Sequence, residues 1–461
     1  MPDESTTPAP ATMNRWLVVV GAILIQLCLG AIYAWSVFTT TLKAPVDEGG
    51  YGFTATQTQW VFSAGLAAFA AAMLVAGRWQ AKVGPRTVAI VGGIVLGIGY
   101  IVGGFVGETF LPQLICIGIV GGIGIGLAYV VPIAVGVKWF PDKKGMITGL
   151  AVAGFGFGAT IWVKLAGSWI WKGGLLAKAD GLFGLPSVQA VFVIYGIAFL
   201  VLILLGSTVM INPPAGWKPA GWNPTAPRGG GKPTVAVTDL TTGQMVGTPQ
   251  YWGLLLMFTG SALAGLMVIG CIRLFGVDSL IANKVVTGDD LEVVRKSAGA
   301  IAGTAMAWYA ILNGLGRIIW GTVSDKIGRK TALFLMCLIQ GIMMLLFYKV
   351  GASELGLIVG ACIIGFNFGG NFALFPAATA DFFGNKNVGT NYPWVFLAYG
   401  IAGIAGPQVA GYFKDAAPVA QSIAEVSAAA WKMPFIIAGV ACLVAAVLGL
   451  MLRAPRAKAA G

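Results

Sequence analysis

The chain has 461 residues, of which 57% are hydrophobic and 10% are charged, and its mean hydropathy is +0.84. Soluble domains carry roughly 25% charged residues, so this chain cannot cover a water-facing surface of ordinary polarity. The composition excludes a disordered protein, a nucleic-acid-binding domain and a secreted disulfide scaffold. The chain has no histidine, which excludes a histidine metal site and Ser-His-Asp catalysis. We expect no metal and no cofactor.

Apolar runs of membrane-spanning length follow one another along the whole chain. A transmembrane helix needs about 20 mostly apolar residues. Reading the runs between charged or Pro/Gly-rich breaks predicts an all-α membrane protein with twelve transmembrane helices, at 14–38, 56–77, 87–107, 110–138, 146–171, 187–211, 251–276, 299–321, 330–350, 355–382, 389–413 and 433–453.

A proline- and glycine-rich stretch at 212–250 divides the twelve spans into two sets of six. The predicted organisation is a disordered tail at 1–13, a six-helix bundle at 14–211, a cytoplasmic linker at 212–250, a second six-helix bundle at 251–453 and a tail at 454–461. Shifting the first half by 244 positions superposes glycine, proline and basic landmarks on the second half, for example Gly84 on Gly328 and Pro132 on Pro376. The two bundles are therefore predicted to be pseudo-repeats, an architecture found in secondary transporters.

Lysine and arginine set the orientation. The excess of basic residues is in the linker and in the loops that lie on the same side as the linker. Basic loops stay in the cytoplasm, so both termini are predicted to be cytoplasmic.

One loop carries a family motif. The residues Gly321, Asp325, Lys326, Gly328, Arg329 and Lys330 resemble the cytoplasmic loop signature of the major facilitator superfamily, after the predicted span 8. The equivalent loop of the first half keeps Gly77, Gly84 and Arg86 but has Ala81 where the signature has an aspartate. The resemblance implies a latch that gates the two halves, and the missing carboxylate argues against a strong latch in the first half.

A narrower resemblance covers nearly the whole chain. The segments AIYAWS from residue 31, KWFPDKKG from residue 138, TPQYW from residue 248, Phe375-Pro376 and Asn391-Tyr392 are similar to the bacterial oxalate/formate antiporter family, which is related to the monocarboxylate transporters. The resemblance implies transport of small carboxylates across the bacterial cytoplasmic (inner) membrane, by a carrier that functions as a monomer in the lipid bilayer. It also implies a binding arginine in span 8 and, in oxalate carriers, a lysine in span 11.

Arg317 matches the span 8 arginine of the family. No acidic residue lies in the middle of a predicted span, so the sequence offers Arg317 no buried partner. A guanidinium in a cavity binds both oxygens of a carboxylate. Asn313, one helical turn earlier, can add a hydrogen bond. The alternative is that Arg317 extends to the cytoplasmic surface.

Tyr399 stands where oxalate carriers have the span 11 lysine. A single cation favours a monocarboxylate of the size of formate, acetate, lactate or pyruvate, although an oxalate/formate-type antiporter and a carrier of an unrelated solute remain alternatives. The resemblance assigns further pocket positions, which are Tyr33, Trp35, Gln57, Tyr129, Phe155, Phe368, Phe372 and Phe396. Lys164 in span 5 is a candidate for a second anion contact, a counter-ion or a residue that extends to the outer surface.

The sequence lacks the usual parts of a proton relay. Animal monocarboxylate carriers have a proton-accepting aspartate at the position of Asn313, and an amide cannot take a proton. Exchange of carboxylates and cotransport of a proton with the substrate both remain open. Glycines in spans 4 and 5 allow helices to approach closely, as a rocking carrier requires. A membrane enzyme would need clustered acidic, histidine or cysteine side chains at depth, so no catalytic activity is expected.

Overall fold

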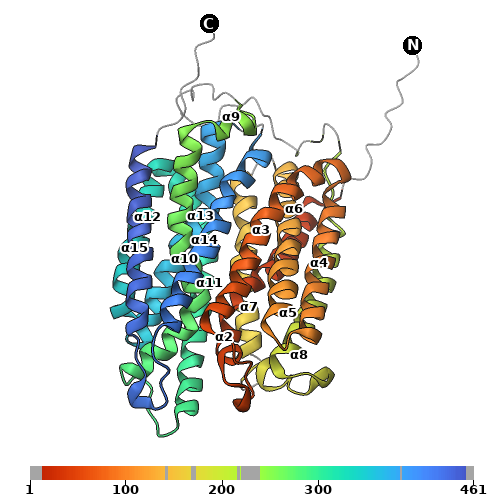
Figure 1. Ribbon diagram of the computed structural model, residues 1–461. Coiled ribbons are helices and arrows are strands. Elements are labelled where there is room, and N and C mark those ends of the chain that lie inside the picture. Colours follow the sequence, from red (N-terminus) through yellow and green to blue (C-terminus); the bar gives the residue numbers. More distant parts are fainter. Residues whose placement is uncertain are drawn as a thin grey trace, which may run out of the picture.

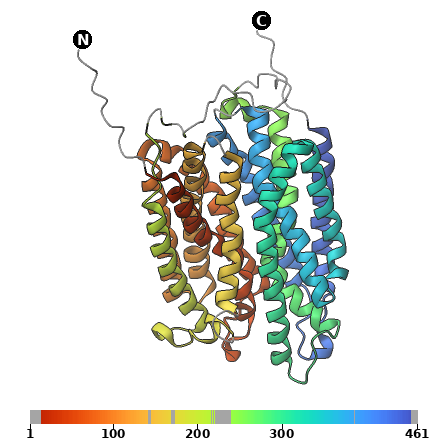
Figure 2. The same cartoon turned by 180° about the vertical axis from the view of Figure 1, so that it is seen from behind.

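The protein is a bundle of long, roughly parallel helices (Figure 1; Figure 2). The computed structural model describes residues 13–140, 144–167, 173–214, 217, 219, 239–384 and 387–452, and this part of the chain contains no strand. It contains twelve helical segments that are long and apolar enough to cross a membrane. The predicted fold class and the predicted number of spans are confirmed. The tail expected at 454–461, nearly all of the tail expected at 1–13, and much of the linker expected at 212–250 lie outside the described residues.

The first half contributes six spans, and two of them are built from several segments. Span 1 combines α1 (Arg15–Leu29), the 3₁₀ segment η1 (Gly30–Ala34) and α2 (Ser36–Lys43). Span 4 combines α5 (Phe110–Gln113), the π-helical segment η3 (Leu114–Val120) and α6 (Gly121–Trp139). The other four are α3 (Ala55–Val83), α4 (Pro85–Val106), α7 (Lys144–Gly167) and α8 (Ser187–Ser207).

The second half contributes α10 (Pro249–Ala282), α11 (Leu291–Ile327), α12 (Arg329–Val350), α13 (Glu354–Phe383), α14 (Val388–Asp415) and α15 (Lys432–Met451). Helices α10 and α11 extend beyond the apolar runs predicted at 251–276 and 299–321. The helices continue there through charged residues such as Asp278 and Arg295, because hydropathy reports the length of the apolar run and not the length of the helix.

The internal repeat is visible in the helix boundaries. Helix α4 spans Pro85–Val106 and α12 spans Arg329–Val350, so both ends differ by 244 positions, the shift found in the sequence. The glycines before these helices share one conformation, with φ of 88° at Gly84 and 86° at Gly328. This left-handed conformation is open to glycine at little cost and ends the preceding helix sharply.

The two halves lie side by side, with α3 against α14 and α7 against α11 along the interface (Figure 1). Small residues allow this approach. A Cβ added to Gly156 of α7 would lie 2.8 Å from the main-chain nitrogen of Gly314 in α11. The outer surface of the bundle is apolar, as Ile98 and Val102 of α4 illustrate with exposures of 49% and 42%. Such a surface suits contact with lipid tails.

The two ends of the bundle are distinguished by the short helix α9 (Thr242–Val246), which lies at the top of Figure 1. The main-chain N–H of Leu240 donates to the carbonyl of Phe383 (2.9 Å), and the Asn387 amide donates to the carbonyl of Leu240 (3.0 Å). These bonds fix the start of α9 to the connection between α13 and α14. We call this end the linker end. The other end, at which α2 terminates, is called the opposite end.

Candidate functional site

Arg317 lies on α11 in the interior of the bundle and is 1% exposed. Its Nε donates a hydrogen bond to Oδ1 of Asn313 (3.1 Å), one helical turn away. Its Nη1 donates to the carbonyl of Val152 in α7 (2.8 Å), so the side chain joins the two halves. Burial excludes the alternative in which Arg317 extends to the aqueous phase at the linker end.

Arg317 has no carboxylate partner among the described residues. None of the described residues forms a salt bridge with it, and both its Nη2 and Nδ2 of Asn313 are buried without a hydrogen-bond partner among the described residues. On insertion scales an arginine at mid-membrane costs roughly 2.5–3.5 kcal/mol. The site therefore holds a positive charge and two free donor groups that the described part of the chain does not satisfy.

Aromatic rings form the walls around this charge. The guanidinium carbon lies 4.0 Å from the ring centre of Phe372 and 5.4 Å from that of Phe155. Both distances are in the range of cation–π attraction, which partly compensates for the lost water. The low dielectric of such walls strengthens the attraction between Arg317 and an entering anion.

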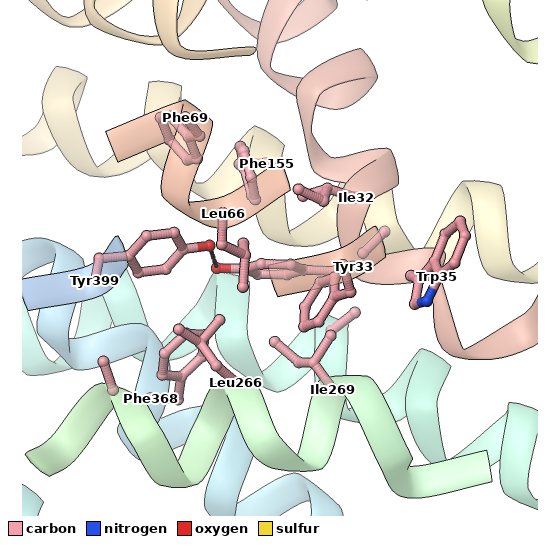
Figure 3. Packing of buried hydrophobic residues seen from close by; sticks show 14 of the residues in the cluster. Ile32, Tyr33, Trp35, Leu66, Phe69, Phe155, Leu266, Ile269, Phe368 and Tyr399 are labelled. Carbon is pink, nitrogen blue, oxygen red and sulfur yellow. Dashed lines mark hydrogen bonds between the residues drawn. The ribbon is translucent and has the colours of Figure 1, made fainter. Parts of the chain in front are cut away.

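Two phenols meet across the interface of the halves. The hydroxyls of Tyr33 and Tyr399 are hydrogen-bonded at 2.9 Å, and neither residue is exposed (Figure 3). Tyr33 lies on η1, where span 1 leaves the α-helical path, and the main-chain oxygen of Phe155 packs so closely on Gly30 that a Cβ there would clash. The close approach of α7 to this break places the Tyr33 ring 5.0 Å from the Phe155 ring.

The remaining aromatic candidates complete one continuous cluster. Tyr129 contacts Phe155 with ring centres 5.7 Å apart, and Phe396 stacks on Tyr399 at 4.8 Å. Phe368 contacts both Tyr33 (6.0 Å) and Phe372 (5.3 Å). The fold thus brings these sequence-predicted pocket positions together around Arg317 from both halves of the chain.

Phe69 of α3 belongs to the same cluster and was not predicted from the sequence. Its ring centre lies 5.0 Å from that of Tyr129, 5.3 Å from that of Phe396 and 5.6 Å from that of Tyr399. Figure 3 shows Phe69 in the cluster that contains Tyr399. The repeat contained the necessary signal, since the shift of 244 positions places Phe69 on Asn313. The same shift places Phe155 on Tyr399, so equivalent positions of the two halves face the centre.

Trp35 does not belong to this cluster, contrary to the expectation. Its indole Nε1 donates to the carbonyl of Thr58 (2.9 Å), and its ring stacks with Phe192 inside the first half. Figure 3 shows it directed away from Tyr399. Residues two apart on a helix face different sides, so Tyr33 and Trp35 cannot both point to the centre.

The placement of Gln57 in the pocket was also wrong. Gln57 lies in the first turn of α3 at the opposite end, where its side chain accepts a hydrogen bond from the main-chain N–H of Thr54 (2.9 Å). The Thr54 hydroxyl accepts in return from the N–H of Gln57 (3.0 Å). This reciprocal arrangement is a capping box, which stabilises a helix start.

Lys164 lies far from Arg317. It is twelve residues beyond Val152 on α7, which is roughly 18 Å along the helix axis. Its Nζ donates to the hydroxyl of Thr304 (3.1 Å), and the side chain lines a cavity of about 1360 Å³ at the opposite end. Arg317 and the central tyrosines do not line this cavity, which leaves the Arg317 site closed toward that end.

The loop motif forms an ion-pair cluster at the linker end. Arg329 contacts Asp325 (2.6 Å) and Asp381 of α13 (3.1 Å), and it also bonds Ser324. Gly321 packs near Ala373, and Lys326 and Lys330 are exposed. In the first half, Gly77, Gly84 and Arg86 have no equivalent cluster among the described residues, which fits the alanine in place of aspartate at position 81.

The family model of the Major Facilitator Superfamily matches residues 23–288 and 281–461. This chain belongs to the major facilitator superfamily. It is 30% identical over 404 residues to the uncharacterized MFS-type transporter YhjX of Escherichia coli, an alignment that covers 86% of this chain and 88% of the relative. The superfamily predicted from the loop motif is confirmed, and the protein is a multi-pass membrane transporter.

Two further relatives have more specific names. The oxalate:formate antiporter of Oxalobacter formigenes is 27% identical, with 85% of this chain and 83% of the relative aligned. The apicoplast pyruvate carrier 1 of Toxoplasma gondii is 24% identical over the same shares of the two chains. The resemblance to the oxalate/formate antiporter group is thereby confirmed.

The fold of this major facilitator protein is also found among solved structures. A bacterial homolog of the human lysosomal transporter Spinster, in its inward-facing and unoccupied conformation, superposes with a TM-score of 0.67. The alignment covers 95% of this chain and 96% of the solved chain at 15% identity. Similarity at this level supports the twelve-helix architecture alone.

Proposed function

We propose that this transporter carries small monocarboxylates of the size of formate, acetate, lactate or pyruvate, and that Arg317 pairs with the substrate carboxylate. One observation carries the proposal. The guanidinium of Arg317 is buried between the halves with a free Nη2 and with no carboxylate partner among the described residues. A carboxylate that enters satisfies the charge and the free donors of Arg317 and Asn313 together.

The charge of the site favours a monoanion. Arg317 is the cation in the central cluster, and the neutral Tyr399 occupies the position of the second cation of oxalate carriers. The Tyr33 and Tyr399 hydroxyls bond each other at 2.9 Å and can exchange that bond for one to the substrate. A dicarboxylate antiporter is the second candidate, because one relative is named an oxalate:formate antiporter.

Transport follows from the division of the site between the halves. We infer that the bundles at 14–211 and 251–453 rock about the central cluster as a monomer, while the linker at 212–250 joins them on the cytoplasmic side of a bacterial inner membrane. The bond from Arg317 to the Val152 carbonyl spans this interface. The substrate competes for the same guanidinium, so binding loosens a contact between the halves.

Uptake into proteoliposomes tests the substrate. Labelled formate, acetate, lactate, pyruvate and oxalate are compared for wild type, Arg317→Lys and the control Arg78→Lys, which changes an exposed arginine of α3. We expect uptake of monocarboxylates by wild type and by the control, and at least a hundredfold lower uptake by Arg317→Lys. Normal transport by a correctly inserted Arg317→Lys variant would refute the assignment. Preferential uptake of oxalate would favour the second candidate.

The coupling needs a separate experiment. With Asn313 in place of a proton acceptor, a proton moves only with the substrate, or the carboxylate is exchanged for another anion. Proteoliposomes that contain a pH dye and no internal anion substrate are supplied with the preferred acid. Acidification of the vesicle interior indicates proton cotransport, and absence of net uptake until an internal carboxylate is loaded indicates exchange.

A further inference from the structure

The cavity at the opposite end is rich in positive charge. Its volume is about 1360 Å³, and residues of both halves line it. The charged residues among its described lining are Lys43, Lys164, Arg273, Arg295, Lys296 and Lys414, against Asp278, Glu292 and Asp415. The cavity therefore attracts anions from the solution at this end.

Two of the three acids already have partners. Asp278 accepts from Nζ of Lys414 (2.5 Å) and from the indole of Trp431 (2.7 Å). The carboxylate oxygens of Asp415 accept from the main-chain N–H groups of Ala55 and Thr56 at the start of α3, each at 2.8 Å. Asp278 therefore neutralises Lys414, and Asp415 stabilises the N-terminus of α3. Neither acid pairs with Arg273 or Lys164.

Of the cavity cations Arg273 and Lys164, Arg273 of α10 has fewer polar partners among the described residues. None of the described residues forms a salt bridge with it, and its Nε is buried without a hydrogen-bond partner among them. The guanidinium lies against Gly299 of α11, where an added Cβ would be 3.3 Å from Nη2. Glycine at this position allows the guanidinium to pack closely against α11.

Lys164 approaches the same helix from the other half. Its ammonium donates to the neutral hydroxyl of Thr304 (3.1 Å), and no described carboxylate lies within 4 Å. Gly299 and Thr304 lie on different sides of α11, and both Arg273 and Lys164 line the same cavity. An anion that enters this cavity therefore meets a cationic side chain from each half.

We propose that Arg273 and Lys164 form a second, weaker carboxylate site that captures the substrate before it reaches Arg317. This inference rests on the proposed function. The site lies outside the Tyr33–Tyr399 pair, on the solvent side of the closed central cluster. It holds the anion with one cation from each half, so the substrate is concentrated at the entrance before the tyrosines separate.

Transport kinetics from each side test the second site. Arg273→Gln and Lys164→Gln are measured singly and together, with Lys349→Gln as the control, an exposed lysine at the opposite end that does not line the cavity. The substrate is the acid that wild type takes up fastest among the five named above. For entry from the cavity side we expect the double variant to raise KM five- to tenfold with Vmax within twofold. For entry from the linker end, the KM of the double variant should equal that of wild type. The control variant should have the wild-type KM for entry from either side.

The two proposals fail separately. An unchanged KM for entry from the cavity side in the double variant would overturn the second site and leave the role of Arg317 intact. Normal transport by Arg317→Lys would instead refute the proposed function. Equilibrium dialysis of labelled pyruvate against purified Arg317→Gln protein gives a readout that needs no transport. Residual millimolar binding that disappears on adding Arg273→Gln supports the second site, and absence of residual binding contradicts it.

Discussion

Arg317 and Arg329 are twelve positions apart, yet the fold treats their charges in opposite ways. Arg329, the first residue of α12, contacts Asp325 and Asp381 and is partly exposed at the linker end. Arg317 is 1% exposed and has aromatic rings, an amide and a carbonyl around it. The chain neutralises Arg329 with its own carboxylates, whereas no carboxylate of the described residues pairs with Arg317.

The surroundings of an arginine side chain therefore decide what its charge does. At the linker end, Arg329 is in contact with water and with two carboxylates. Each of these ion pairs therefore contributes little to the stability of the fold. In the interior the guanidinium of Arg317 has lost its hydrating water, so its attraction to one anionic partner is much stronger than it would be in water. Substitutions at the two arginines and at their neighbours can separate these two situations.

The largest effect should follow from replacing each arginine by lysine. Lysine keeps the charge but lacks the planar pair of donors. We expect Arg317→Lys to lower kcat/KM for the preferred carboxylate at least a hundredfold, which corresponds to about 2.7 kcal/mol. Arg329→Lys should lower it less than threefold. Initial uptake rates in proteoliposomes check both variants, and comparable losses would remove the distinction between the two sites.

Asn313→Asp should convert the surroundings of Arg317 into those of Arg329. The Asn313 amide oxygen already lies 3.1 Å from Nε of Arg317, so a carboxylate there pairs with the guanidinium directly. We expect KM to rise at least tenfold because the substrate must displace an internal anion. Substrate titrations of the uptake rate measure the change in KM. The matched control is Asn367→Asp, which changes a buried amide on a different helix, α13. An unaltered KM would contradict the pairing.

Tyr399→Phe should have a smaller effect, since it removes one neutral donor and keeps the ring. We expect KM to rise about three- to fivefold, in line with the loss of one hydrogen bond of about 1 kcal/mol. Tyr100→Phe, which changes a buried phenol outside the central cluster, is the control. The same KM in both variants would separate Tyr399 from substrate binding.

The smallest effect is expected at the loop motif. Asp381→Asn removes one of the two carboxylates of Arg329, and 53% of the Asp381 side chain is exposed. Exposed ion pairs contribute about 0.2–1 kcal/mol. Thermal unfolding followed by tryptophan fluorescence should show a slight loss of stability, and uptake should stay within twofold of wild type. A tenfold loss of uptake would show that the loop controls transport more strongly than its exposure suggests.

The fold could be predicted from sequence because the membrane permits few solutions. Lipid cannot satisfy main-chain groups, so a long apolar run is helical in almost any context. Helix ends were harder to predict. Helix α10 continues to Ala282 and α11 begins at Leu291, where polar residues keep the helix beyond the apolar run.

The site could be predicted only in part, since composition does not determine the direction of a side chain. The family resemblance proposed Arg317 and most of the aromatic positions that the fold brings together. Trp35 was misplaced because the 3₁₀ turn at η1 directs Tyr33 and Trp35 to different sides. Gln57 was misplaced because a polar residue in the first turn of a helix can cap that helix. Phe69 is an apolar residue in an apolar span, so nothing in its own sequence surroundings indicates a site. Only its equivalence with Asn313 in the internal repeat does so.

The bond from Arg317 in α11 to the Val152 carbonyl in α7 has a consequence for assembly. The proposed anion site does not exist in either bundle alone, because the second half supplies the guanidinium of Arg317 and the first half supplies the Val152 carbonyl beside it. Two separately synthesised polypeptides, divided within the linker sequence, should therefore each insert as an inert fragment. Activity should return only where the fragments meet in the same bilayer.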